Sequence, residues 1–499
     1  MRHIIAFDAG GTAIKAAVYD ERGAERSVAT RAMPPLHPVP GWLERNPEAM
    51  WRAICDISHE VLEAARIDPS SIAVVGVTGY GDGLHLVDRN GDPVRNAILS
   101  QDQRAQRIVE RWRDEGTEAE TIPLTYQRQW AGKPAPLIAW LEAHEPDALA
   151  RAERALMCLD YLRFRLTGAL GLEISGLSSG GLIDQKLRRW TPTVLELFGL
   201  GRYARLFGEA MEPLTIAGKV SESAAAETGL LAGTAVCAGY ADGPSMAIGL
   251  GATDEDLISV VSGTWGLNQL ASRRPITDGS ISAPIVGPRP GEFILIHAAP
   301  TSASAFEWFV DSVIGRVDSG RRNREKLFDF CNDEASRTRA EESIPIFLPY
   351  LNGRLNDPQA HGTFAGLASW HSIGHMIRAI YEGIAFEHRT HIDHLLCGRR
   401  PRAARFAGGA ARSRPWLQIF SSALDLPLEL AAANELGALG AAIIAAVSAG
   451  LYPDLESAVE AMTRVRERIE PEQGLVEILA ARRQLFVKLR DLISGGPVE

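Results

Sequence analysis

Cysteine is scarce in this chain, and the few cysteines follow no recognisable pattern. Only five occur among 499 residues, with no Cys-x-x-Cys spacing: Cys55, Cys158, Cys237, Cys331 and Cys397. A sparse, odd set argues against a disulfide framework or a zinc knuckle and favours reduced thiols. We therefore expect a cytoplasmic protein.

Long apolar runs are also missing. The most apolar stretch, residues 431–450, contains Asn434, Glu435 and three glycines, which makes it a poor membrane span. Residues 1–3 lead directly into a strand-like segment and show no features of a signal peptide. We expect a protein that does not associate with membranes.

Positive charge is not in excess either. Lys and Arg total 52 against 62 Asp and Glu, which gives a net charge of −10. This balance does not favour a polyanionic partner, so we expect no binding to nucleic acid. Small anions can still bind locally.

The chain has enough apolar residues for two cores. Its 499 residues are 46% hydrophobic, and domains usually hold about 100–200 residues, which predicts two large domains. We place the boundary in the small-residue segment after Asp242, where no Pro/Ser-rich linker occurs, and expect the halves to pack closely with a hinge. The predicted division is 1–248, 249–450 and a C-terminal helical appendage, 451–499.

The order of predicted elements indicates α/β layering. Strands at residues 4–8 and 13–19 flank a glycine turn and predict a β-hairpin at a sheet edge, followed by a helix over 48–65 and a strand over 72–78. A second strand followed by a glycine turn begins at residue 257, so the chain contains two copies of one plan. A small-residue helix after Asn434 has glycines that would allow close approach to a neighbour or ligand.

Two glycine turns could bind phosphate. The segment Asp8-Ala9-Gly10-Gly11-Thr12 offers backbone N–H groups, a hydroxyl and a carboxylate that could reach a magnesium ion. Alone, it is equally an ordinary turn, and the same holds for Ser262-Gly263-Thr264. One such turn at the first strand of each half favours function, because the two would face each other across a cleft and hold one phosphate chain.

Other candidate residues have structural alternatives. The turn Gly408-Gly409 would let an adenine lie against the backbone, or is a tight strand-to-helix turn. Asp242 lies at the domain junction between two glycines, where Asp is often only a turn residue. His388, His391 and His394 could form a metal cluster, but their spacing along an amphipathic helix favours a solvated polar face.

The most distinctive stretch begins at Pro349. It reads Pro349-Tyr350-Leu351-Asn352-Gly353-Arg354, then Asp357-Pro358, Gly362-Thr363-Phe364-Ala365-Gly366-Leu367 and Arg378-Ala379-Ile380-Tyr381-Glu382-Gly383. It resembles the second signature of the FGGY carbohydrate kinases, a family within the superfamily that includes actin and hexokinase, and the resemblance runs from Ile4 to about Gly450. The resemblance implies an α/β fold of two actin-like domains, a duplicated ribonuclease H-like fold with an interdomain cleft.

The resemblance also implies roles for individual residues. Asp8 matches the metal-binding carboxylate for Mg²⁺, and Asp242 matches the catalytic base. The residues matching the ATP-binding motifs are Gly11, Thr12, Lys15, Gly263, Thr264, Gly408, Gly409 and Ser413. The residues matching substrate contacts are Gly81, Asp82, Asp102 and Arg104, together with Asp242. Dimers are frequent in similar kinases, so a homodimer is the candidate assembly.

Departures from the family pattern narrow the substrate. Ser100 replaces the usual Trp, Asp82 stands where relatives carry His or Glu, and Gly243 follows the base where Asn or Gln is common. These departures argue against a glycerol or D-xylulose kinase. The L-xylulose kinase and polyol kinase branch is resembled most by the combination Gly81-Asp82-Gly83-Leu84, Ile98-Leu99-Ser100 and Pro300-Thr301-Ser302 before Glu307-Trp308-Phe309. We expect an ATP-dependent kinase acting on a primary hydroxyl of an L-xylulose-like ketopentose or a C4–C6 alditol. The alternative is an actin-like or chaperone-like ATPase that switches a protein interaction and has no polyhydroxyl pocket.

Overall fold

A computed structural model describes residues 2–317, 323–354, 357 and 359–493. The chain forms two compact units, each built from several stretches of sequence. The first comprises Met1–Thr253, Ala271–Leu295 and Ala433–Arg464, and the second comprises Asp254–Leu270, Ile296–Ala432 and Val465–Glu499. The division at 248 and 450 expected from the sequence stays a prediction, because these units follow spatial contacts rather than contiguous segments.

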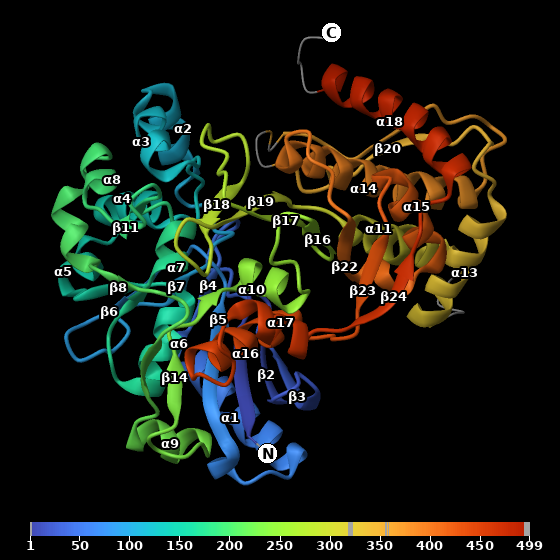
Figure 1. Ribbon diagram of the computed structural model, residues 1–499. Coiled ribbons are helices and arrows are strands. Elements are labelled where there is room, and N and C mark those ends of the chain that lie inside the picture. Colours follow the sequence, from blue (N-terminus) through green and yellow to red (C-terminus); the bar gives the residue numbers. More distant parts are fainter. Residues whose placement is uncertain (1, 318–322, 355–356, 358, 494–499) are drawn as a thin grey trace. The chain divides into compact units, whose positions relative to one another are not determined.

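The first unit is built on a mixed sheet (Figure 1) with strand order β13-β14-β5-β1-β2-β3, and β15 pairs with β5. Its strands are β1 (His3–Ala9), β2 (Ala13–Asp20), β3 (Glu25–Ala32), β5 (Ile72–Gly79), β13 (Ile216–Lys219), β14 (Ala235–Cys237) and β15 (Tyr240–Ala241). Strand β1 is antiparallel to β2 and parallel to β5, and β15 is also parallel to β5. The expectation of an edge hairpin is therefore wrong: β5 covers one side of it and β3 covers the other. Strand β3 gives little sequence signal because most of its side chains are exposed.

Helices pack on this sheet according to the alternation of side chains along its strands. Ile4 and Ala6 of β1 share a buried cluster with residues of α16 (Leu436–Ser448). Helix α1 (Pro47–Ala65) packs against β2 and β3, while α6 (Cys158–Thr167) packs against β5. A Cβ built on Gly440 would lie 1.9 Å from the Ser245 carbonyl oxygen, so α10 (Asp242–Gly249) contacts α16 almost backbone to backbone. The predicted close approach by glycines of this helix is confirmed.

Shorter elements complete the first unit. They are β4 (Glu44–Arg45), η1 (Pro69–Ser71), β6 (His85–Val87), β7 (Ala97–Ile98), α2 (Gln106–Asp114), α3 (Thr117–Thr125), α4 (Pro134–His144), α5 (Pro146–Arg151), β8 (Arg154–Leu156), β9 (Leu172–Glu173), α7 (Ile174–Ser179), β10 (Ile183–Asp184), β11 (Arg189–Trp190), α8 (Thr193–Leu197), η2 (Gly201–Leu206), β12 (Ala210–Met211), α9 (Glu222–Thr228), β18 (Ala283–Val286) and α17 (Leu455–Met462).

The second unit repeats the plan of the first. Its strands, in sheet order, are β19 (Phe293–Ala299), β17 (Gly266–Ser272), β16 (Leu257–Ser262), β22 (Ala403–Gly408), β23 (Leu428–Ala431) and β24 (Val465–Ile469). Strand β16 is antiparallel to β17 and parallel to β22, as β1 is antiparallel to β2 and parallel to β5. The predicted duplication of one α/β plan is confirmed.

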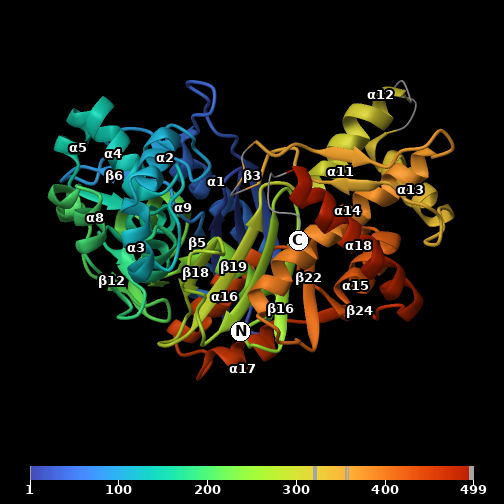
Figure 2. The same cartoon turned by 90° about the horizontal axis from the view of Figure 1, so that it is seen from above.

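Three helices of the second unit, α14 (Ile373–Leu396), α15 (Arg414–Leu424) and α18 (Gln473–Ile493), lie side by side (Figures 1 and 2). The remaining elements are α11 (Ala303–Phe309), η3 (Val310–Ile314), α12 (Gly315–Val317), α13 (Arg324–Arg337), β20 (Ile346–Leu348), β21 (Thr363–Ala365) and η4 (Gly409–Arg412). The C-terminal segment was expected to be helical, yet residues 465–469 form β24, which pairs with β23. Among the described residues, no helix combines the length and apolar character needed to cross a membrane.

Candidate active site

Three parallel strands bring three acidic residues of the first unit to one sheet edge. Asp8 lies near the end of β1 and is paired with Thr78 of β5, while Ala241, at the end of β15, is paired with Gly79. Asp242 follows Ala241 directly, and Asp82 lies in the turn after β5. Because the carboxyl ends of parallel strands share an edge, residues more than 200 positions apart in sequence become neighbours.

The carboxylates of Asp8 and Asp242 influence each other. Burial raises the pKa of Asp8 to about 7, the negative charge of Asp242 adds to this effect, and Lys15 opposes it. Burial also raises the pKa of Asp242 to about 6, against backbone N–H groups of Gly243 and Gly81 that stabilise its charged form. The Gly243 N–H donates to Asp242 Oδ1 at 2.6 Å. Near neutral pH, such a pair of buried carboxylates can share a proton or bind a cation.

The first turn of α16 packs directly against Asp8. A Cβ built on Gly437 would lie 2.4 Å from Asp8 Oδ2, so only glycine leaves room for the carboxylate there. Glu435, just before the helix, accepts a hydrogen bond from Lys15 Nζ at 2.5 Å. Lys15, expected to contact the nucleotide, thus has a carboxylate partner within the first unit, and its role toward phosphate stays a prediction.

The Arg45 side chain fixes the first glycine turn through hydrogen bonds to its backbone. Its guanidinium donates to the Gly10 carbonyl at 2.8 Å, the Gly11 carbonyl at 2.5 Å and the Met33 carbonyl at 2.9 Å. The side chain is buried, so these charge-assisted bonds fix where the turn's carbonyls point. Sequence reasoning missed Arg45, because no local motif links it to a turn 35 residues earlier.

The turn after β5 holds Asp82 in an unusual backbone conformation. Asp82 is buried and adopts φ +61°, a left-handed conformation that is uncommon outside glycine. Ser179 Oγ donates to Asp82 Oδ1 at 3.4 Å. Burial raises the pKa of Asp82 to about 7, although the positive charge of Lys133 acts in the opposite direction.

Asp102 and Arg104, also expected to bind substrate, form a buried ion pair with each other. Arg104 Nε donates to Asp102 Oδ1 and Nη2 donates to Oδ2, both at 2.9 Å. Asp102 Oδ2 also accepts from the Leu43 N–H at 2.6 Å, and Glu44 Oε1 accepts from Arg104 Nη2 at 2.9 Å. Arg104 Nη1 is buried without a hydrogen-bond partner among the described residues.

In the second unit, parallel pairing joins the two predicted nucleotide turns. Ser262 at the end of β16 is paired with Gly408 at the end of β22, so the turns containing Gly263, Thr264 and Gly409 begin side by side. Gly408 has φ +103°, and a Cβ there would lie 2.2 Å from the Ser262 carbonyl oxygen. Glycine is required at this position.

Ser413, the last residue matching the adenosine motif, is used inside the protein. It is the N-cap of α15, where it accepts a hydrogen bond from the Trp416 N–H. Its hydroxyl donates to Asn332 Oδ1 at 2.6 Å. A nucleotide contact by Ser413 therefore stays a prediction.

A polar network lies behind the turn after β16. Ser302 Oγ is 3.0 Å from Ser262 Oγ and 2.9 Å from His388 Nε2, and His388 Nδ1 is 2.8 Å from Asn268 Oδ1. Burial lowers the pKa of His388 to about 3, so its ring is neutral. His388 and His391 are buried in this network and only His394 is exposed, so the expected solvated histidine face is wrong for the first two. The described residues contain no group of three or more side chains suited to hold a metal ion.

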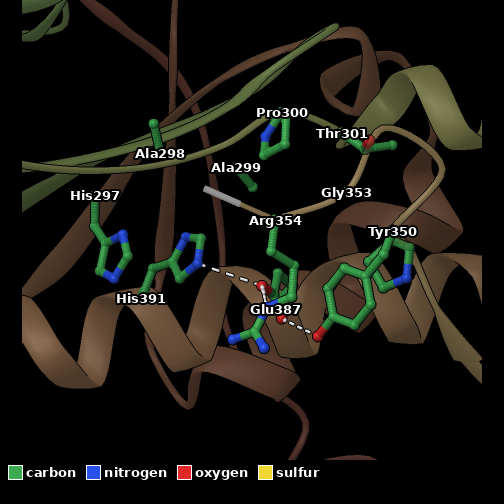
Figure 3. A pocket seen from close by; sticks show the side chains of 11 residues that line it. His297, Ala298, Ala299, Pro300, Thr301, Tyr350, Gly353, Arg354, Glu387 and His391 are labelled. Atoms are coloured by element: carbon green, nitrogen blue, oxygen red, sulfur yellow. Dashed lines mark hydrogen bonds and ion pairs between the residues drawn. The ribbon is translucent and has the colours of Figure 1, made fainter. Parts of the chain in front are cut away.

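A small cavity of the second unit lies between the end of β19 and α14 (Figure 3). Tyr350 donates to Glu387 Oε2 at 3.0 Å, and His391 Nε2 lies 3.4 Å from Glu387 Oε1. Despite burial, which raises the pKa of Glu387, His391 and Arg354 lower it to about 2. The cavity volume, about 30 Å³, suits one or two water molecules rather than a nucleotide. Tyr350 and Arg354, from the distinctive stretch of sequence, thus belong to a packed polar cluster.

Known protein families match both halves of the chain. The FGGY family of carbohydrate kinases, N-terminal domain, matches residues 3–249, and its C-terminal domain matches residues 258–449. The chain is 31% identical to the L-xylulose/3-keto-L-gulonate kinase of Escherichia coli strain K12, with 98% of this chain and 97% of the relative covered. It is 28% identical to the autoinducer-2 kinase of Yersinia enterocolitica, with 94% and 90% covered.

Solved structures agree in fold. The crystal structure of xylulose kinase from Rhodospirillum rubrum has a TM-score of 0.88 with this chain at 27% identity, covering 98% of this chain and 99% of that one. These matches favour the carbohydrate kinase over the actin-like or chaperone-like ATPase. With its two-domain actin-like fold, this sugar kinase belongs to the FGGY family of carbohydrate kinases.

Proposed function

We propose that this enzyme transfers the γ-phosphoryl group of ATP to a primary hydroxyl of a ketopentose or related polyol, with L-xylulose-like ketoses as first candidates. The observation that carries the proposal is the convergence of Asp8, Asp82 and Asp242 at one sheet edge, where the three acids have separate tasks. The full-length similarity to a relative named for L-xylulose supports the substrate class.

Asp242 is the proposed general base. Two backbone N–H groups, from Gly243 and Gly81, orient its carboxylate. It takes the proton of the primary hydroxyl as that oxygen bonds to the γ-phosphorus, while the bond from phosphorus to the β,γ-bridging oxygen breaks and ADP leaves. A pKa of about 6 leaves this base mostly deprotonated at neutral pH yet still able to accept a proton.

Asp8 is the proposed Mg²⁺ ligand. Its carboxylate is fixed against Gly437. Burial raises its pKa most, and the negative charge of Asp242 adds to this shift; a divalent cation would offset both effects. Mg²⁺ commonly takes one or two carboxylates together with substrate phosphates and water, so a larger protein cage is not required. When bound, Mg²⁺ supplies charge neutralisation for the phosphates.

The remaining assignments complete the proposal. The proposed ATP contacts are Gly11, Thr12, Lys15, Gly263, Thr264, Gly408, Gly409 and Ser413. The proposed acceptor contacts are Gly81, Asp82, Asp102 and Arg104. A cytoplasmic location accords with the five free cysteines, four of them buried, and a homodimer stays the candidate assembly.

A second acceptor deserves testing because one relative is named for it. The similarity to the autoinducer-2 kinase extends over 94% of this chain, although its identity is lower than that of the L-xylulose/3-keto-L-gulonate kinase. Autoinducer-2 is therefore the alternative acceptor.

The experiment is a coupled assay of ADP formation over L- and D-ketopentoses, 3-keto-L-gulonate, C4–C6 alditols and autoinducer-2. We expect one ketose or polyol to raise ATP turnover far above the rate without acceptor. If kcat/KM is highest with autoinducer-2, the acceptor is autoinducer-2 and not a ketopentose or polyol. If none of these compounds stimulates ATP turnover, the proposed function is refuted.

A further inference from the structure

A buried polar segment of the first unit, residues 129–133, lies beside the Asp82 turn. None of its side chains belongs to the candidate active site described above. Lys133, the residue before α4, is completely buried, and Gln129 is 2% exposed. The Gly83 N–H donates to the Gly132 carbonyl at 2.8 Å, which ties the Asp82 turn to this segment. Sequence reasoning missed both side chains, because their spacing matches no motif.

The Lys133 ammonium has capacity for further hydrogen bonds. It donates to Gln127 Oε1, and Nζ lies 4.6 Å from the centroid of the Trp130 ring. An ammonium group carries three hydrogens, so one acceptor does not saturate it. Burial lowers the pKa of Lys133 to about 8, and the negative charges of Asp82 and Glu118 act against this shift. A buried cation with open donors needs acceptor oxygens close by.

The Gln129 side-chain amide has unused hydrogen-bonding capacity. Its Nε2 and Oε1 atoms are both buried and have no hydrogen-bond partner within the part of the chain that the structure describes. Its backbone N–H, in contrast, donates to Glu118 Oε1 at 2.9 Å, so the residue itself is fixed. An unpaired buried amide costs about 1–3 kcal/mol, which a bound polar group would recover.

Lys133 and Gln129 border the same space. A Cβ built on Gly181 would lie 3.3 Å from Gln129 Nε2 and 3.5 Å from Lys133 Nζ. Both nitrogen atoms therefore lie close together, against the backbone of Gly181. Gly181 lies two residues after Ser179, whose hydroxyl donates to Asp82, and the charge of Lys133 acts on the Asp82 carboxylate. The Lys133 side chain therefore lies near this carboxylate.

We propose that Lys133 and Gln129 are specificity residues of the acceptor site. They bind the carbonyl oxygen of a neutral keto sugar, next to a sugar hydroxyl that donates a hydrogen bond to Asp82. Two neighbouring donors suit an oxygen that has two lone pairs and no hydrogen of its own. An alditol hydroxyl at that point would bring a hydrogen that needs a further acceptor, and a carboxylate would add negative charge beside Asp82. The inference rests on the proposed function and narrows its acceptor to ketoses.

The test compares L-xylulose with xylitol, one of the two pentitols that form when its carbonyl group is reduced. We expect the wild-type enzyme to prefer the ketose, and Lys133→Met to lower kcat/KM for the ketose by about 10- to 100-fold, because it removes a charged hydrogen bond. The value for the pentitol should change by less than about 3-fold. Gln129→Leu should shift the ratio in the same direction. Lys219→Met, which changes an exposed lysine of β13, is the matched control and should leave both values unchanged.

The outcomes separate this inference from the proposed function. If the wild-type enzyme phosphorylates neither compound nor any other ketose or polyol, the proposed function fails. If Lys133→Met lowers both values equally, Lys133 has only a structural role and the inference is overturned. Should Lys133→Met unfold, Gln129→Leu decides, because replacing an unpaired buried amide by an apolar side chain is tolerated. An unchanged ketose-to-pentitol ratio in that folded variant would overturn the inference.

Discussion

Replacing Asp242 by Asn tests the proposed base with little change in shape. In the structure, Asp242 Oδ1 accepts the Gly243 N–H at 2.6 Å, and an amide oxygen can accept the same bond. The substitution therefore keeps the position of the side chain but removes its ability to take a proton. General-base loss typically lowers the rate about 10²- to 10⁴-fold, and we expect a fall of that size in kcat.

The pH dependence gives a second, independent readout. A base acts only when deprotonated, so wild-type kcat/KM should rise as pH increases through about 6, the pKa of Asp242. Because the Asp242 charge contributes to the pKa of about 7 at Asp8, that pKa should fall in the variant. Asn does not titrate, so the limb that depends on Asp242 should be lost from the residual activity of Asp242→Asn, and the limb that depends on Asp8 should move to lower pH.

The assay measures initial rates of acceptor phosphorylation from pH 5 to 9, with ATP affinity from calorimetry on the same samples. Asp56→Asn, an exposed position on α1, is the matched control and should behave like the wild type. Near-normal kcat in folded Asp242→Asn, or a loss confined to ATP binding, would show that the assignment of the base is wrong.

Four further substitutions probe the rest of the site. Arg45→Met removes the hydrogen bonds to the Gly10, Gly11 and Met33 carbonyls. Denaturant unfolding should show a free energy of unfolding that is lower by about 1–3 kcal/mol or more, and the KM for ATP should rise. Gly437→Ala should displace Asp8 and lower kcat about 10²-fold, whereas Gly474→Ala, which has no neighbour within 4 Å, should have no effect. Asp82→Ala should lower acceptor kcat/KM about 5- to 150-fold with unchanged ATP affinity. Thr264→Val should lower kcat/KM for ATP by an amount equivalent to about 1–3 kcal/mol. An unchanged KM and kcat for ATP would show that the Thr264 hydroxyl does not contact phosphate.

Local sequence pattern was sufficient where a strand runs directly into a glycine turn. Asp8 and Gly263 could be selected because each follows a continuous apolar run that forms a buried strand. The duplicated plan could be predicted for the same reason. Strand β3 could not, because its exposed, charged side chains carry no alternating apolar signal.

Long-range contacts explain what the sequence could not predict. Arg45 reaches carbonyls 35 residues earlier, and the ion pair between Lys15 and Glu435 spans 420 positions. The spacing of His388 and His391 predicted a solvent-facing surface, but Ser302 and Asn268, from other strands and loops, supply buried partners. Such partners are defined by strand pairing across the whole unit.

The measurement that tests the central claim most directly is proton-coupled ³¹P NMR of the product formed from ATP and L-xylulose. Transfer to a primary hydroxyl predicts a new phosphomonoester signal split into a triplet by the two protons of the adjacent CH₂ group, growing in step with ADP. The same signal should be absent with Asp242→Asn over the same period. A doublet, which marks a secondary ester, or inorganic phosphate as the sole new phosphorus species, as in simple ATP hydrolysis, would contradict the account.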